Sequence, residues 1–314
     1  MTGNGKKEPK GGGSATGGNP SKGAAKSTRR EAMRAEMLRR QEQERRRARL
    51  KLAAGIAVVV VIVAAIGTGV GLSVSKSGGG GGGDTSQSAS ASVTKAITSI
   101  SPSVVDAVGN GGGIGLVKPT PVSGAPALTS DGKPRVLYVG AEYCPYCAAE
   151  RWAMVAALSR FGTFTNLGQT SSSSTDVYPN TATLSFHGAT YTSDYLSFTG
   201  VEQTDRNQLP LDTLSAADKK ILATYDTKKY VGSDGGIPFI AYGGKFLSSG
   251  ASYDPGVLQG LSHQQIADDL ANPKSEVTRS IVGAANVITA TLCTLTGQKP
   301  AAVCTAAGVQ AAAS

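Results

Sequence analysis

The pattern of apolar and polar positions divides the chain into a polar N-terminal part, one uncharged apolar segment and a long C-terminal part of alternating short strands and helices. Residues 52–74 contain no charged side chain. A helix rises about 1.5 Å per residue, so this segment is long enough to cross a hydrocarbon core of about 30 Å. The pattern therefore predicts a single transmembrane helix at 52–74.

The positive charge of the chain lies ahead of this apolar segment. Residues 1–51 carry 15 Lys and Arg against 5 Asp and Glu, and the remainder is nearly neutral. Positive flanks stay in the cytoplasm, so we expect residues after 74 to lie outside it. We read the basicity as a topology signal and expect the lipid bilayer, not nucleic acid, as its partner.

Low-complexity stretches flank the span. Residues 1–28 are too polar and Gly-rich to bury a core, so we expect disorder there, followed by a charged helix up to 51 that completes a cytoplasmic basic tail. Residues 75–127 are expected to form a Gly/Ser-rich linker with a docking segment. Within that segment, near-helical spacing at 93–108 predicts one or two short helices.

The centre of the remaining chain is a strand that leads into a helix with two cysteines at its start. The apolar run 136–139 predicts a buried strand, and Cys144-Pro145-Tyr146-Cys147 opens a helical pattern. The first amides of a helix are unpaired and carry partial positive charge, which favours a thiolate at Cys144. Pro145 suits the first helical position. We expect Cys144 to attack and Cys147 to resolve mixed disulfides.

Side chains next to the cysteines extend this site. Tyr143 and Tyr146 are expected to form part of an apolar surface for unfolded chains. Glu142 either moves protons to Cys147 or is an exposed turn carboxylate. Trp152, on the apolar face of the helix, is expected to pack in the core.

Two other interpretations of the cysteine pair are a static disulfide and half of a zinc site. A zinc site needs four ligands, and the only histidines, His187 and His263, belong to no ligand cluster. We therefore expect no metal.

Further strands and helices alternate after the cysteine pair. Strands are predicted at 164–167, 183–187 and 191–201, with a turn at 187–190 and a surface loop at 171–174. Helices are predicted at 215–225, with Ser215 as N-cap, and at 262–270, where Ser262 and Gln265 resemble a capping box. Such alternation predicts a mixed α/β layer architecture.

The tail at 273–314 predicts a helical hairpin that is broken at Gly297 and Pro300. Cys293 lies in the first arm and Cys304 in the second. We expect a structural disulfide between them in preference to a second redox pair, since neither thiol begins a helix. Such a bond persists in an oxidising compartment, in agreement with the topology.

The Cys-Pro-Tyr-Cys stretch after a strand resembles the active site of the thioredoxin superfamily, and its Pro-Tyr dipeptide is similar to that of glutaredoxins. Gly236-Ile237-Pro238-Phe239-Ile240 matches the cis-proline segment of that superfamily. The resemblance implies a thioredoxin-like fold at 128–272 in a membrane-anchored prokaryotic branch. It also implies that Pro238, preceded by Ile237, faces Cys144 and binds substrate with Pro145. Cys147 and Pro238 lie further apart than in the minimal fold, which implies an insertion.

Together these features predict a single-pass membrane thiol–disulfide oxidoreductase. It would act outside the cytoplasm on cysteines of exported proteins, without a bound cofactor, and exchange electrons with a membrane redox partner. The alternative is a non-enzymatic thioredoxin-like module that binds a cell-envelope partner and keeps its cysteine pair oxidised and buried.

Overall fold

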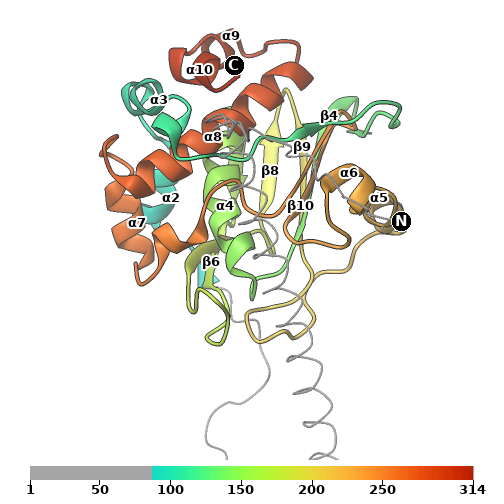
Figure 1. The fold of residues 1–314 in the computed structure, drawn as a ribbon, viewed down its shortest axis with the longest axis horizontal. Helices are drawn as coiled ribbons and strands as arrows, with labels where there is room; N and C mark the ends of the chain where they lie inside the picture. Colours follow the sequence, from blue (N-terminus) through green and yellow to red (C-terminus); the bar gives the residue numbers. More distant parts are fainter. Residues whose placement is uncertain (1–86, 314) are drawn as a thin grey trace, which may run out of the picture. The chain divides into compact units, whose positions relative to one another are not determined.

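A mixed sheet around the predicted strand at 136–139 forms the centre of the fold (Figure 1). Strand β4 (Lys133–Gly140) pairs in parallel with β9 (Ser197–Glu202) and antiparallel with β10 (Phe239–Tyr242). Strand β11 (Phe246–Ser249) continues the sheet antiparallel to β10. Two short strands complete it, β2 (Thr120–Pro121) beside β11 and β3 (Thr129–Ser130) beside β4.

The computed structural model describes residues 87–313. The predicted basic tail, the apolar span at 52–74 and the first part of the linker lie outside these residues. Within the described range, no helix combines the length and the apolar character that crossing a membrane requires.

Strand β4 is apolar on both faces because both faces are covered. Val136 and Tyr138 face the larger hydrophobic core, and Leu137 and Val139 face a second, smaller one. Successive side chains of a strand point to opposite faces, so a continuous apolar run suits a sheet that lies between two helical layers.

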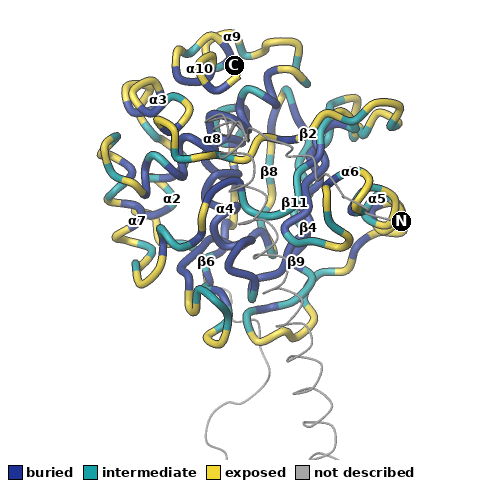
Figure 2. Tube along the Cα trace, in the orientation of Figure 1, coloured by how far each residue is buried: buried dark blue, intermediate teal, exposed yellow. Residues whose placement is uncertain are grey.

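Helices α4 (Pro145–Leu158) and α8 (Glu276–Leu295) pack together in the larger core on one face of the sheet. Helices α5 (Ala216–Tyr225) and α6 (Lys228–Val231) cover the other face. The layers are visible in Figure 1. Figure 2 shows that α4 is buried along its length while α5 is largely exposed. The site therefore begins on the most enclosed helix of the described chain.

Two small sheets are built from the strands between α4 and β9 in the chain, together with β1 from the N-terminal side. One pairs β5 (Gly162–Thr165) with β8 (Thr190–Ser193). The other has the order β1 (Gln87–Ser88), β6 (Gly168–Ser171) and β7 (Ala182–Ser185). The turn predicted at 187–190 thus joins strands of two different sheets.

The single strand predicted at 191–201 is wrong, because the structure divides it into β8 and β9. The hydroxyl oxygen of Ser193 accepts hydrogen bonds from the backbone N–H groups of Tyr195 (3.0 Å) and Leu196 (3.2 Å). These side-chain bonds favour a turn over a continued ladder. The strand predicted at 164–167 is likewise displaced, since β5 ends at Thr165 and β6 begins at Gly168.

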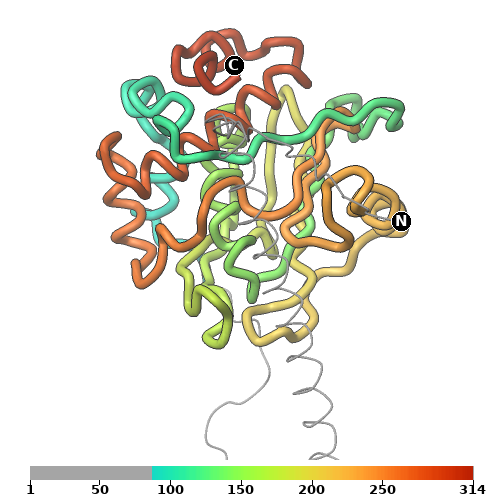
Figure 3. The backbone as a smooth tube through the Cα atoms, in the orientation of Figure 1, coloured from blue at the N-terminus to red at the C-terminus, as the bar shows by residue number. Residues whose placement is uncertain are grey.

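The segments on both sides of the central fold join its core. Helices α2 (Ala91–Thr98) and α3 (Pro102–Val108) form where short helices are predicted, and they bury Val93, Ile97 and Val104 in the larger core. Figure 3 shows these early helices beside the C-terminal ones. The remaining helical elements are η1 (Gly111–Gly113), η2 (Pro255–Leu258), α7 (His263–Asp269), α9 (Ala301–Cys304) and α10 (Ala307–Ala313).

Candidate active site

The two cysteines lie where β4 leads into α4. Cys144 is the N-cap residue of α4 and Pro145 is its first residue. The backbone N–H of Cys147 donates a hydrogen bond to Cys144 Sγ over 3.3 Å. Both are free thiols, and their exposed fractions are 5% for Cys144 and 0% for Cys147. An unpaired helix amide thus meets the first sulfur, as the N-cap position predicts.

The segment before β10 reaches the same place. Because Phe239 pairs with Val139, the residues before β10 lie at the end of β4 from which the cysteine turn departs. The Ile237–Pro238 peptide bond is cis. The thiol of Cys144 donates to the Ile237 carbonyl oxygen over 3.7 Å. The structure therefore brings Ile237 and Pro238 to the first sulfur.

Aromatic side chains cover the sulfurs. Tyr143, Tyr146 and Ile237 pack around the two cysteines. Tyr178, from the loop between β6 and β7, joins this cluster, and its ring meets that of Tyr146 edge to face at 6.2 Å between centroids. The loop is held by a 2.9 Å hydrogen bond from Ser173 N–H to the Tyr143 carbonyl oxygen. The sequence predicts a surface loop here but not its contact with the site.

Glu142 is fully buried, so its interpretation as an exposed turn carboxylate is wrong. Its Oε1 accepts a hydrogen bond from Ser185 Oγ over 2.6 Å, and its Oε2 meets no hydrogen-bond partner among residues 87–313. Burial raises the pKa of this carboxyl above its ordinary value, and the Ser185 hydrogen bond opposes the rise. The carboxyl of Glu142 therefore holds its proton more tightly than an exposed carboxyl does.

A buried ion pair lies under the same turn. Arg151 Nε and Nη2 donate to the two carboxylate oxygens of Glu202 over 2.7 and 2.6 Å, and both side chains are fully buried. Arg151 Nη2 also donates to the Ala141 carbonyl oxygen over 2.7 Å. The pair thus connects α4 to the end of β9 and to the start of the cysteine turn.

A second buried carboxylate, Glu150, points to another partner. It accepts hydrogen bonds from the Ser252 N–H (2.7 Å) and the Ser252 hydroxyl (3.0 Å). Burial raises the pKa of Glu150 to about 7. This carboxyl titrates near neutral pH and fixes the segment after β11 to α4.

The two thiols have different surroundings. Burial raises the pKa of the Cys147 thiol well above its ordinary value, the hydrogen bond with Cys144 raises it further, and the Arg151 charge opposes both. Cys147 is thus held as a thiol, while the sulfur of Cys144 accepts a helix amide. This arrangement is suited to attack by Cys144 and a later step by Cys147.

Glu150, Arg151 and Glu202 are not among the site residues that the sequence predicts. The first two are the only charged residues between Pro145 and Leu158, and a charge within an otherwise apolar helix could have indicated buried partners. Glu202 gave no such signal. Trp152 is fully buried, as predicted, and its indole N–H donates to the Ala182 carbonyl oxygen over 3.0 Å.

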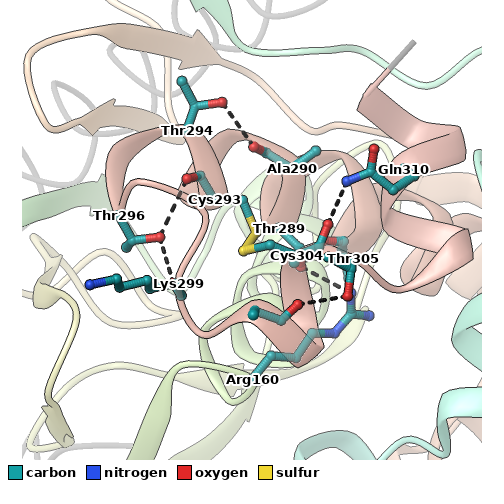
Figure 4. Close-up of a disulfide and its surroundings, with 12 residues drawn as sticks. Arg160, Thr289, Ala290, Cys293, Thr294, Thr296, Lys299, Cys304, Thr305 and Gln310 are labelled. Atoms are coloured by element: carbon teal, nitrogen blue, oxygen red, sulfur yellow. Dashed lines mark hydrogen bonds between the residues drawn. A yellow bond between two sulfur atoms is a disulfide. The ribbon is translucent and has the colours of Figure 1, made fainter.

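The predicted disulfide between Cys293 and Cys304 is present, with a sequence separation of 11 residues (Figure 4). Arg160, which follows α4, donates to Thr289 of α8 over 2.9 Å close to this bond. The disulfide therefore lies towards the C-terminal end of α4, whereas Cys144 and Cys147 lie at its other end. That separation fits a structural clamp better than a second redox pair.

No group of three or more His, Cys, Asp and Glu side chains in the described range is placed to hold a metal ion. A family model described as a domain of unknown function, DUF929, matches residues 121–294. This range includes strands β3, β4, β9, β10 and β11 of the central sheet, Cys144 and Cys147, and most of α8. No curated protein and no solved structure matches the chain.

Proposed function

The chain belongs to the DUF929 family, and we propose that it is a thiol–disulfide oxidoreductase with Cys144 and Cys147 as its catalytic residues. One observation carries this proposal. Two free thiols lie at the start of a buried helix, and the first contacts both a helix amide and the carbonyl oxygen that precedes Pro238. A thiolate at Cys144 would be stabilised there.

We further propose that the fold is thioredoxin-like with an insertion. The sheet order β9-β4-β10-β11 supports this, as does the position of α4 and α8 on one face and α5 on the other. The dithiol follows the central strand and Pro238 precedes the next antiparallel strand. The insertion is the segment between α4 and β9, which contains β5 to β8.

In the reductive direction, the Cys144 thiolate attacks one sulfur of a substrate disulfide and the second substrate sulfur leaves as a thiolate. Cys147 then attacks Cys144 Sγ, so that the Cys144–Cys147 bond forms and the bond to substrate breaks. The substrate disulfide gains two electrons, and the protein dithiol loses them. Two protons, one from each protein thiol, end on the two leaving thiolates. We propose that Glu142 relays the second proton: its carboxylate accepts it as Cys147 attacks and then gives it to the leaving substrate thiolate. The oxidative direction is the reverse.

The substrates that we propose are cysteines of exported proteins, and residues 52–74 would anchor the domain outside the cytoplasm. The disulfide between Cys293 and Cys304 supports this location, because such bonds persist in oxidising compartments. A membrane redox partner would then return the dithiol to its working state, and Tyr143, Tyr146, Ile237 and Pro238 would contact substrate.

A second candidate function is a non-enzymatic binding module of the cell envelope. The observation that favours it is the burial of both thiols, since Cys144 is 5% exposed and Cys147 is fully covered. An enzyme with this site must expose Cys144 when substrate binds, most directly by displacement of the loop that carries Tyr178.

The experiment that separates the two functions uses the full-length chain with Cys147→Ala, which cannot resolve a mixed disulfide. We expect this variant to retain substrate proteins through bonds that a reductant breaks, and the matched Cys144→Ala variant to retain none. The unmodified chain should reduce a model protein disulfide or oxidise the corresponding dithiol. Absence of both trapping and turnover in folded protein would favour the binding module.

A further inference from the structure

Among residues 87–313, Arg151 is the one cation that acts on the charge of Cys147. Its position is fixed by groups outside the helix. It lies four residues after Cys147, so both side chains occupy one face of α4. Glu202 and the Ala141 carbonyl oxygen hold its Nε and Nη2 atoms.

The third nitrogen, Arg151 Nη1, is buried and finds no hydrogen-bond partner within the described part of the chain. The hydroxyl of Tyr138, which lies in the same group of interacting side chains, is also buried without a partner there. A buried donor left unpaired costs stability, on the order of 1–3 kcal/mol for a neutral group and more for a charged one. An unpaired buried donor of this kind can have a role in the reaction of the protein.

The ionisable groups that act on Cys147 come from three elements. They are Cys144 at the N-cap of α4, Arg151 of α4, Glu202 of β9 and Tyr138 of β4. Glu142 in addition interacts with Arg151 and Glu202. Arg151 lowers the pKa of Cys147, whereas burial, Cys144 and Glu202 raise it.

We propose that Arg151 is a positioning residue for the resolving step, in which its fixed guanidinium stabilises the developing thiolate of Cys147. This inference rests on the proposed function and adds a role to it. When Cys147 loses its proton to attack Cys144 Sγ, negative charge appears on a sulfur that no water reaches. The unpaired Nη1 of Arg151 supplies the opposite charge on the same face of α4. In the reverse step, when the protein disulfide opens, it stabilises Cys147 as the leaving thiolate.

Glu202 allows this role to be distinguished from a purely structural one. Its anion fixes Arg151 but opposes negative charge on Cys147. If the Arg151–Glu202 pair only held α4 against β9, loss of either charge would distort the site in the same way. Attack by Cys144 and attack by Cys147 would then both become slower. If Arg151 stabilises the thiolate, loss of the cation slows the Cys147 step, and loss of the anion alone does not.

The test is a two-phase reaction of the reduced full-length chain with dithiobis-nitrobenzoic acid, followed by the absorbance of the released thiolate. The first release reports attack by Cys144, and the second reports attack by Cys147 on the mixed disulfide. The variants are Arg151→Met combined with Glu202→Gln, which leaves no unpaired buried charge, Arg151→Lys, and Glu202→Gln alone. Circular dichroism and the intact disulfide at Cys293 verify folding.

We expect Arg151→Met with Glu202→Gln to slow the second release by about three- to fourfold. A rise of about one unit in the pKa of the attacking thiol lowers its thiolate fraction about tenfold, and the greater nucleophilicity of the more basic thiolate recovers part of that loss. The pH profile of the second-release rate should move to higher pH in this variant. The rate of the first release should remain within about twofold of that of the unmodified chain. Arg151→Lys should retain a faster second release than the neutral pair, and Glu202→Gln should not slow it. An unchanged second release in the neutral pair, or equal slowing in all variants, would overturn the role of Arg151. Absence of the first release in the unmodified chain would instead contradict the proposed function.

Discussion

Glu150 and Arg151 are neighbours in the chain, but they act in different parts of the fold. Successive residues of a helix point about 100° apart, so one side chain reaches Ser252 after β11 and the other reaches Glu202 on β9. Both are fully buried, and each is stabilised by partners from outside α4. Removal of one member of the buried Arg151–Glu202 ion pair is costly, about 3–5 kcal/mol, because the other charge is left uncompensated.

The stability of the fold is expected to depend on pH through Glu150. The folded state raises the pKa of this carboxyl from 4.5 to about 7, so it binds the proton more tightly than the unfolded chain does. Stability should therefore fall as the pH rises from about 4.5 to about 7, by up to about 3 kcal/mol in total. Glu150→Gln can retain both bonds to Ser252, and it should remove this fall.

Urea unfolding at a series of pH values between about 4 and 8 measures the effect. The matched control is Glu276→Gln, the same substitution at an exposed residue of α8. Parallel stability curves for the unmodified chain and Glu150→Gln would contradict the assignment of this pH dependence to Glu150.

Helix α7 illustrates how far local signals determine an element. Ser262 Oγ accepts a hydrogen bond from Gln265 N–H over 3.3 Å, and Gln265 Oε1 accepts one from Ser262 N–H over 2.9 Å. Each bond satisfies an amide that the helix itself leaves unpaired. The helix therefore begins where its own residues specify.

We expect Ser262→Ala to destabilise the domain by about 1 kcal/mol, because the α7 N-terminus loses one of these bonds. Ser262→Thr keeps a hydroxyl oxygen at the cap and should retain most of that stability. Thermal unfolding of both variants measures the difference. An Ala variant as stable as the Thr variant would show that the capping bond contributes nothing.

Elements that depend on such local signals could be predicted from the sequence, among them the start of α4, the cap of α5 at Ser215 and the capping box of α7. The pairing of β5 with β8 and of β6 with β7 could not, because it joins residues distant in the chain. The break at Ser193 depends on a side chain whose hydrogen bonds compete with the backbone pairing of a continued strand.

At the site, the positions of Cys144, Cys147 and Pro238 follow from the motif. The cover by Tyr178 and the pairing of Arg151 with Glu202 arise only when distant segments fold together.

At the scale of the whole molecule, the central sheet cannot be separated from the segments on either side of it. Helix α8 shares the larger core with α4, and Val104 of α3 packs in that same core. The disulfide between Cys293 and Cys304 connects α8 to α9 and so fixes the chain that follows α8. The tail thus contributes to the stability of the domain.

Replacement of Cys293 and Cys304 by Ser should lower the free energy of unfolding by about 2–3 kcal/mol, because the unfolded chain regains the entropy of a short closed loop. The reduction potential of the Cys144–Cys147 couple should stay unchanged, since the clamp lies at the opposite end of α4. Urea unfolding and equilibration with a thiol redox buffer measure the two quantities. A shifted potential would indicate that the tail disulfide communicates with the site.

The proposed topology makes a prediction for the complete chain in the membrane. We expect a membrane-impermeant maleimide to label Lys219→Cys, an exposed position on α5, in intact cells. Ser14→Cys in the basic tail should react only after lysis. The parent chain provides the background from its own thiols. Labelling of the tail from outside would reverse the orientation.

Because one cysteine pair is bonded and the other is free, the number of free thiols in the chain reports the redox state of Cys144 and Cys147. Cys293 and Cys304 are bonded to each other, so at most the other two cysteines can capture an alkylating reagent under denaturing, non-reducing conditions. A heavy maleimide would then leave an oxidised chain at its original mobility on a gel and shift a reduced chain by two adducts, while a trapped substrate complex would run far above both. Rapid acid quenching of living cells would therefore show in one lane whether the Cys144–Cys147 pair is kept oxidised or reduced.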